Sequence, residues 1–125
     1  EISNIFNRKI NINLIEREDE NNLKKLEKIL FLTKKLALKK KIDFYFVYLP
    51  KPSYYFKDEF FPDKSLYFKE IRSMVYKLDI NFINIHKEVF EKDKNPKKYY
   101  PFEISGHYNL EGYKKVADTI YNFTK

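Results

Sequence analysis

The only two glycines of this 125-residue chain, Gly106 and Gly112, bracket His107 within seven positions. An imidazole takes up and returns a proton near neutral pH, so His107 is well suited to general acid–base chemistry. Glycine permits turns and close approaches that other residues do not, and Asn109 is a favoured residue directly before a helix. We interpret residues 102–112 as a shaped loop that presents His107 from a rigid frame. The alternative is a structural histidine that only packs or caps at the start of the next helix.

The other candidates for chemistry are His86, at the end of a predicted strand, and Ser53, shortly after another. We interpret His86 as a structural strand-end residue, and Ser53 lacks the flanking glycines of a nucleophile elbow. The histidines and scattered carboxylates show no ligand spacing such as HExxH, so we expect no metal site. Two glycines placed this way also exclude G-x-G-x-x-G and P-loop motifs, and we expect no cofactor.

The elements that must position His107 are predicted from hydrophobic periodicity. Apolar residues three and four apart predict an amphipathic helix over about residues 22–41. Residues 1–20 give no firm element, and the charged run 16–22 reads as a loop leading into that helix. The β-branched and aromatic run 42–49, ended by Pro50, is typical of a strand covered on both faces.

A second helix, a second strand and a last helix are expected further along. Asp63 or Ser65 can cap the second helix, and residues 80–86 predict a strand. Residues 87–92 form a short amphipathic piece before a polar loop. The apolar stripe of the second helix is Tyr67, Ile71, Met74, Val75 and Leu78, and the last helix, after Asn109, carries Tyr113, Val116, Ala117, Ile120 and Tyr121 inward.

This order predicts an α/β fold in which helices cover both faces of a parallel sheet through right-handed crossovers. Two confident strands make a thin sheet, so we expect residues 1–125 to be one partial domain, the C-terminal half of a larger doubly wound fold. Ligands of such folds bind beyond the carboxyl ends of the strands, where the loop with His107 is expected.

Composition limits the partners. The net charge is +7, but 22 of the 25 basic residues are Lys and only 3 are Arg, which disfavours phosphate and base recognition by bidentate guanidinium groups. We therefore expect no nucleic-acid partner. No apolar run is long enough for a membrane span, and the chain has no cysteine and no initiator Met. We expect it to begin mid-protein or after processing, and its compartment stays open.

The stretch GHYNLEGYKKVADTI, residues 106–120, resembles the closing block of the SGNH (GDSL-type) hydrolases, in which the active-site His precedes a short spacer, a Gly and an amphipathic helix. The segments FYFVYLPKPSYY and INFINIH are similar to late strands of that family, so the resemblance covers about residues 20–125. It implies a flavodoxin-like three-layer α/β/α fold and hydrolysis or transfer of an acyl ester by Ser–His chemistry, with His107 as general base.

The chain also departs from the family pattern. The serine block and the Gly and Asn blocks of the oxyanion hole are absent, so the nucleophile is expected outside this chain, in a missing N-terminal half or a partner chain. The family's acid, two or three residues before the His, is replaced by Ser105 and Ile104. Either Glu103 or a backbone carbonyl would then orient His107, and Ser53 is a further candidate nucleophile.

The aromatic residues of two loops could wall a substrate pocket, since flat rings suit acyl chains and pyranose rings. We expect substrate contacts from Tyr54, Tyr55, Tyr108 and Asn109, and the substrate would be a small-molecule or carbohydrate acyl ester. The alternative is packing of these rings under long loops. The rival to an enzyme is a non-catalytic α/β binding or assembly module that has lost the catalytic residues, and this chain alone is expected to be inactive.

Overall fold

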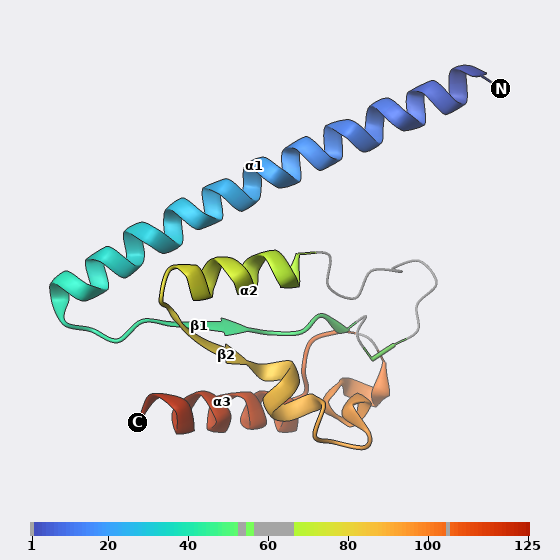
Figure 1. Cartoon of the computed structure of the whole chain (residues 1–125). Coiled ribbons are helices and arrows are strands. Elements are labelled where there is room, and N and C mark those ends of the chain that lie inside the picture. The colour runs from blue at the N-terminus through green and yellow to red at the C-terminus, as the bar shows by residue number, and fades with distance from the viewer. Residues whose placement is uncertain (1, 53–54, 57–66, 105) are drawn as a thin grey trace. The chain divides into compact units, whose positions relative to one another are not determined.

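The computed structural model describes residues 2–52, 55–56, 67–104 and 106–125 (Figure 1). They form two compact units, Glu1–Asp43 and Phe44–Lys125. The partial single domain expected over the whole chain stays a prediction, and each unit is described by itself.

The first unit is one helix, α1 (Ile2–Lys40). The prediction of a loop over residues 16–22 was wrong, because the helix runs through them. No glycine or proline interrupts residues 1–49, and Glu, Arg, Lys and Leu are good helix formers, so the charged run extends the helix. The helix ends at Lys40, and the left-handed φ of 55° at the next residue, Lys41, lets the Ile42 N–H donate to the Ala37 carbonyl at 3.0 Å.

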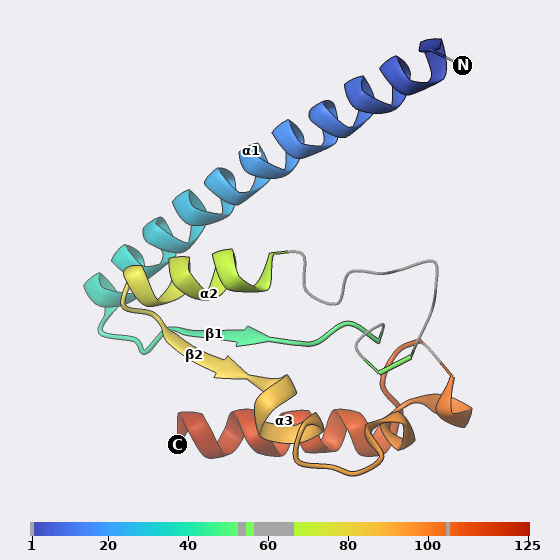
Figure 2. The same cartoon turned by 45° about the vertical axis from the view of Figure 1, so that its right-hand side comes forward.

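The second unit is a mixed α/β structure around a two-stranded parallel sheet. Strands β1 (Tyr45–Tyr48) and β2 (Asn81–Asn84) pair with Tyr45 opposite Asn81, which confirms the predicted parallel β-α-β order. Both strands are shorter than the predicted runs. Helix α2 (Phe68–Lys77) lies on one face of the sheet and α3 (Leu110–Thr124) on the other, in both views (Figures 1 and 2).

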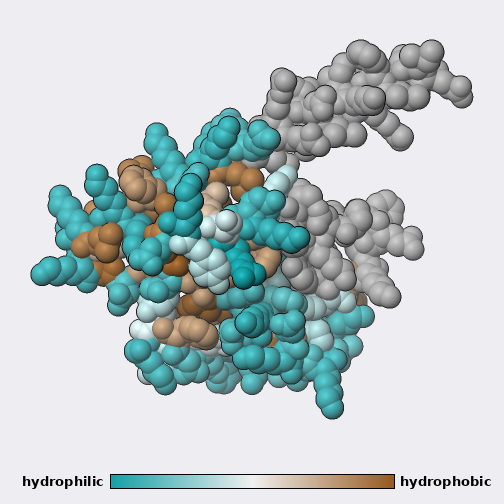
Figure 3. All heavy atoms as spheres, in the orientation of Figure 1, coloured by the Kyte–Doolittle hydropathy of each residue, from teal (hydrophilic) through white to brown (hydrophobic). Residues whose placement is uncertain are grey.

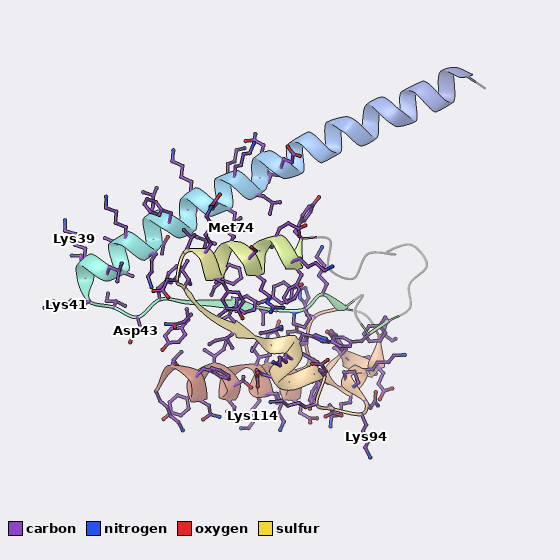
Figure 4. All side chains as sticks on the ribbon, viewed as in Figure 1. Lys39, Lys41, Asp43, Met74, Lys94 and Lys114 are labelled. Carbon is purple, nitrogen blue, oxygen red and sulfur yellow. The ribbon has the colours of Figure 1, made fainter. Side chains whose placement is uncertain are left out.

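The alternation of side chains explains why both faces of β1 are partly covered. Tyr45 and Val47 pack against the main core, whereas Phe46 stacks on Phe82 at 6.0 Å between ring centroids. Asp63 and Ser65, the expected helix caps, lie outside the described residues, and Tyr67 stands at the N-cap without a side-chain bond. The predicted stripe of α2, which includes Met74 (Figure 4), is buried or half-buried throughout: Tyr67, Ile71, Met74, Val75 and Leu78.

The core of this unit lies between the sheet and α3. Three short helical turns connect β2 to α3, namely η2 (His86–Phe90), η3 (Pro96–Tyr99) and η4 (Pro101–Glu103). The buried cluster consists of Ile83, Ile85, Val89, Phe90, Tyr99, Tyr100 and Val116. The lower rim of the face in Figure 3, over α3 and the preceding loop, is hydrophilic. Lys94 and Lys114 belong to this part of the chain and lie on the side away from the sheet (Figure 4).

The prediction for the inward face of α3 was right for two of its five residues. Val116 is buried and Ile120 packs against the core cluster. Tyr113 and Tyr121 are 54% and 65% exposed, and Ala117 is exposed as well, so these three do not face the core. The described sheet has only two strands, and it covers only part of the apolar arc of this helix.

Candidate active site

The loop that carries His107 is held in place through Asn109. The Asn109 backbone N–H donates to the Tyr99 carbonyl at 2.8 Å, and its side-chain Nδ2 donates to the Lys98 carbonyl at 2.7 Å. Its Oδ1 accepts the N–H of Gly112 at 3.0 Å, which confirms Asn109 as the N-cap of α3. The backbone N–H, the Nδ2 and the Oδ1 of Asn109 are therefore all hydrogen-bonded within the loop and the start of α3. The predicted substrate contact from Asn109 stays a prediction, but its amide is engaged.

The two glycines have different roles. A Cβ on Gly112 would meet the Tyr99 carbonyl oxygen at 2.7 Å, so the expected close approach is present, against the backbone of Tyr99 instead of against the sheet. A Cβ on Gly106 would meet nothing within 4 Å, and its φ is not left-handed. The chain does bend at Gly106, as expected, but neither its φ nor the space around it calls for glycine.

Tyr108 ties this loop to the end of β1. Its hydroxyl donates to the Pro50 carbonyl oxygen at 2.9 Å, and burial raises the pKa of Tyr108 to about 12. The group therefore stays protonated and donating at neutral pH. Tyr108 can offer a ring wall to a ligand, while its hydroxyl is already engaged.

His107 borders an apolar hollow of about 220 Å³, just beyond the carboxyl end of β1. The hollow is lined by Leu49, Pro50, Pro52, His107, Tyr108 and Tyr113, among others. His107 is exposed and makes no hydrogen bond within the part of the chain that the structure describes. Its ring nitrogens are thus open to a group that enters the hollow or approaches its rim.

Glu103 is not paired with His107. Its Oε1 accepts from the Nδ2 of Asn95 at 2.9 Å, and no ion pair with His107 is present among the described residues. Phe102 and Glu103 both have left-handed φ values, 54° and 55°, in a turn closed by the bond from the Glu103 N–H to the Tyr100 carbonyl. Glu103 as the orienting acid stays a prediction that would require Asn95 to be released.

Tyr55 lies at a different histidine. Its hydroxyl and the Nδ1 of His86 are 2.8 Å apart, and its ring stacks on Phe90 at 5.1 Å. Tyr55 does not line the hollow at His107. Ser53 and Tyr54 lie outside the described residues, so the roles predicted for them stay predictions. His86 has a side-chain partner, as expected for a structural strand-end residue.

The loop before η3 supports this frame electrostatically. Asp93 accepts from the Nζ of Lys98 at 2.8 Å and from the Tyr99 hydroxyl at 2.7 Å. These bonds, together with the Asn95 N–H, hold the pKa of Asp93 far below its usual range. The carbonyls of Lys98 and Tyr99 also accept the two hydrogen bonds that Asn109 donates. Asp93 therefore binds the side chains of the same two residues that hold the His107 loop in place.

A larger groove of about 490 Å³ lies between η2 and α3 and does not include His107. Its carboxylates are engaged by lysines in the pairs Glu88–Lys92, Asp93–Lys98 and Asp118–Lys114. Because they are already neutralised and the groove is open and polar, we regard the smaller apolar hollow as the better candidate site.

Sequence reasoning missed Leu49, Pro50 and Pro52 as walls of the hollow. The available signal was their position, because they directly follow the predicted strand at the edge where ligands bind. No group of three or more potential metal ligands occurs among the described residues, and no described helix is long and apolar enough to cross a membrane. The chain was compared with protein-family models, curated proteins and solved structures, and none of them matches it.

Proposed function

We propose that this chain is the C-terminal part of an SGNH-type (GDSL-type) esterase or acyltransferase with a flavodoxin-like three-layer fold. The observation that supports the proposal is His107, whose imidazole is unengaged among the described residues and borders an apolar hollow beyond the end of β1. In α/β sheets this is the edge at which ligands bind. The nucleophile is a serine outside residues 1–125.

In this mechanism His107 takes the proton of the serine hydroxyl as the serine oxygen attacks the ester carbonyl. The imidazolium then gives this proton to the departing alcohol, which leaves an acyl-serine ester. Water or an acceptor hydroxyl attacks that ester, His107 takes its proton, and the proton returns to the serine oxygen. A backbone carbonyl orients the imidazole, or Glu103 does so after release from Asn95.

The hollow favours a small, uncharged acyl group. Its volume of about 220 Å³ is below the roughly 300 Å³ at which pockets for drug-sized ligands begin. Leu49, Pro50 and Tyr113 offer apolar walls, and His107 is the only described lining residue with an acidic or basic side chain. The alcohol part of the ester, a small molecule or a carbohydrate, would lie outside the hollow.

The test uses the complete protein with p-nitrophenyl acetate and butyrate. His107→Gln should lower kcat/KM by about 10²- to 10⁴-fold, because it removes the general base while keeping a side chain of similar size. His86→Gln is the matched control and should retain turnover, since His86 is hydrogen-bonded to Tyr55. A fluorophosphonate should label a serine outside residues 1–125. Unchanged turnover in His107→Gln would remove His107 from the mechanism.

The second candidate is a non-catalytic binding or assembly module. Glu103 supports it, because the nearest carboxylate before His107 in the sequence is bonded to Asn95 and is not paired with the imidazole. A wild-type protein that neither hydrolyses these esters nor reacts with the fluorophosphonate would favour this module over the enzyme.

A further inference from the structure

A separate cavity of about 170 Å³ lies beside strand β2. Its lining comes from α2, β2, η2 and the last turn of α3, and α2 and α3 cover opposite faces of the sheet (Figures 1 and 2). Because both helices line the cavity and β1 does not, it lies beyond the edge of β2 that is turned away from β1. It shares no lining residue with the hollow at His107.

Three aromatic rings give this cavity flat apolar walls. The rings of Tyr76 and Phe82 meet edge to face, with 5.8 Å between their centroids. Phe123 adds the third ring from α3. Tyr76 is 57% exposed and Phe123 is 47% exposed, so neither ring is covered by the fold itself. Such exposed ring faces suit a ligand that is itself a flat ring.

Two cations at the same cavity lack an anionic partner. The guanidinium of Arg72 lies over the Tyr76 ring, 5.5 Å from its centroid, and makes no hydrogen bond or ion pair with the described residues. The Lys87 side chain makes none either, although its backbone N–H donates to the Asn84 Oδ1 at 3.3 Å. The contact with Tyr76 keeps the guanidinium beside the aromatic wall.

The remaining charged group of the lining is a carboxylate that already has a partner. The Oε2 of Glu88 is 2.7 Å from the Nζ of Lys92, which is not part of the lining. Arg72 and Lys87 against Glu88 leave the lining with one net positive charge. This charge is complementary to a monoanion, and a second negative charge on the ligand would be repelled by Glu88.

From this combination we propose that the cavity beside β2 binds a small aromatic acid, a carboxylate monoanion carried on a single flat ring. The planar guanidinium of Arg72 suits bidentate binding of the carboxylate, and the Lys87 ammonium adds a second positive charge. The ring of the ligand packs against Phe82 and Phe123. The cavity volume is well below the roughly 300 Å³ at which pockets for drug-sized ligands begin, which favours one ring over a nucleotide.

The test is a titration of the complete protein with 4-fluorophenylacetate, followed by ¹⁹F NMR. We expect saturable binding, and Arg72→Met should weaken it by about 10-fold or more, because charge-assisted hydrogen bonds are lost while a long unbranched side chain stays. Lys69→Met is the matched control, since it removes a positive charge from α2 outside the cavity. No saturable binding to the wild type, or equal losses in the two variants, would overturn the proposal.

Two further probes test the chemistry of the ligand. 4-Fluorobenzyl alcohol keeps the ring without the carboxylate, and trifluoroacetate keeps the carboxylate without the ring. We expect each to bind about 10-fold or more weakly than 4-fluorophenylacetate, because each loses one of the two contacts. Trifluoroacetate that binds as well as 4-fluorophenylacetate would show that exposed cations alone attract the anion, and this result would overturn the aromatic acid as the ligand.

One more variant separates this cavity from the hollow of the proposed function. His107→Gln should bind 4-fluorophenylacetate as the wild type does, because His107 does not line the cavity beside β2. Loss of binding in His107→Gln would assign the probe to the other hollow and overturn the proposal. Binding that depends on Arg72 in a protein without esterase turnover would support this site and remove only the hydrolase proposal.

Discussion

The backbone of Gly112 passes so close to Tyr99 that a Cβ at position 112 would lie 2.7 Å from the Tyr99 carbonyl oxygen. The same carbonyl accepts the N–H of Asn109 at 2.8 Å. The Tyr99 carbonyl thus contacts both the first turn of α3, at Gly112, and the end of the His107 loop, at Asn109. Because the neighbour is a backbone oxygen, it cannot rotate away as a side chain could.

Gly112→Ala should therefore destabilise the protein. Alanine in a helix gains about 1 kcal/mol over glycine by propensity, but the clash with a fixed backbone oxygen costs about 1–3 kcal/mol and more for larger residues. We expect a net loss of stability, checked by urea denaturation of the complete protein. Gly106→Ala is the matched control and should be neutral or stabilising by about 0.4–1 kcal/mol. Equal effects at the two glycines would contradict this account of Gly112.

Asn109→Ala removes the cap and the tie to Lys98 together, and it should cost about 1–2 kcal/mol. Asn109→Asp separates these two contributions. A carboxylate still accepts the Gly112 N–H and suits a helix N-terminus, but it cannot donate to the Lys98 carbonyl. We expect Asn109→Asp to retain most of the free energy of unfolding that Asn109→Ala loses. If Asp and Ala are equally damaging, the bond to Lys98 is the dominant contribution and the cap is secondary.

Local patterns were sufficient to predict the strands, their parallel order and the N-cap at Asn109. Each of these depends on a few adjacent residues, such as the apolar run before Pro50. The long extension of α1 was missed because charged helix formers at 16–22 were interpreted as a loop. Propensity without a glycine or proline favours a helix there.

The site required contacts between distant segments, which a single sequence does not specify. Tyr108 bonds Pro50 across 58 positions, and Tyr55 meets His86 across 31. The roles of the two glycines could not be told apart from the sequence. A side chain at position 112 would clash with the Tyr99 backbone, whereas one at position 106 would meet nothing within 4 Å. Glu103 was assigned by proximity in sequence to His107, whereas its turn directs it to Asn95.

Tyr100→Phe and Tyr108→Phe form a matched pair. The Tyr100 hydroxyl is buried and makes no hydrogen bond of good geometry among the described residues, and burial, with a smaller contribution from the neighbouring Tyr108, raises its pKa. Removing it should leave stability within about 0.5 kcal/mol or increase it, because no bond is lost. Tyr108→Phe leaves the Pro50 carbonyl without its donor and should cost about 1 kcal/mol. Thermal melts of both variants would check this, and a larger loss in Tyr100→Phe would show that its hydroxyl has a partner.

Asp93 should make the stability of the second unit depend on acid pH. Its bonds to Lys98, Tyr99 and the Asn95 N–H lower its folded-state pKa, so the ionised form stabilises the fold. This contribution is fully present above the unfolded-state pKa of about 3.9 and is lost as the pH falls through the lower folded-state value. Asp93→Asn should therefore have a lower Tm than wild type at pH 7.

The difference between Asp93→Asn and wild type should shrink progressively as the pH is lowered below about 4, because Asp93 then takes up a proton in the unfolded state while it is still ionised in the folded state. It should also shrink in 1 M NaCl, where the exposed pair with Lys98 is screened. Glu91→Gln is the control, since Glu91 is exposed and its side chain has no partner among the described residues. A Tm difference that stays constant from pH 7 to pH 2 would mean that Asp93 acts by hydrogen-bond geometry, which Asn cannot copy, and that its charge contributes nothing.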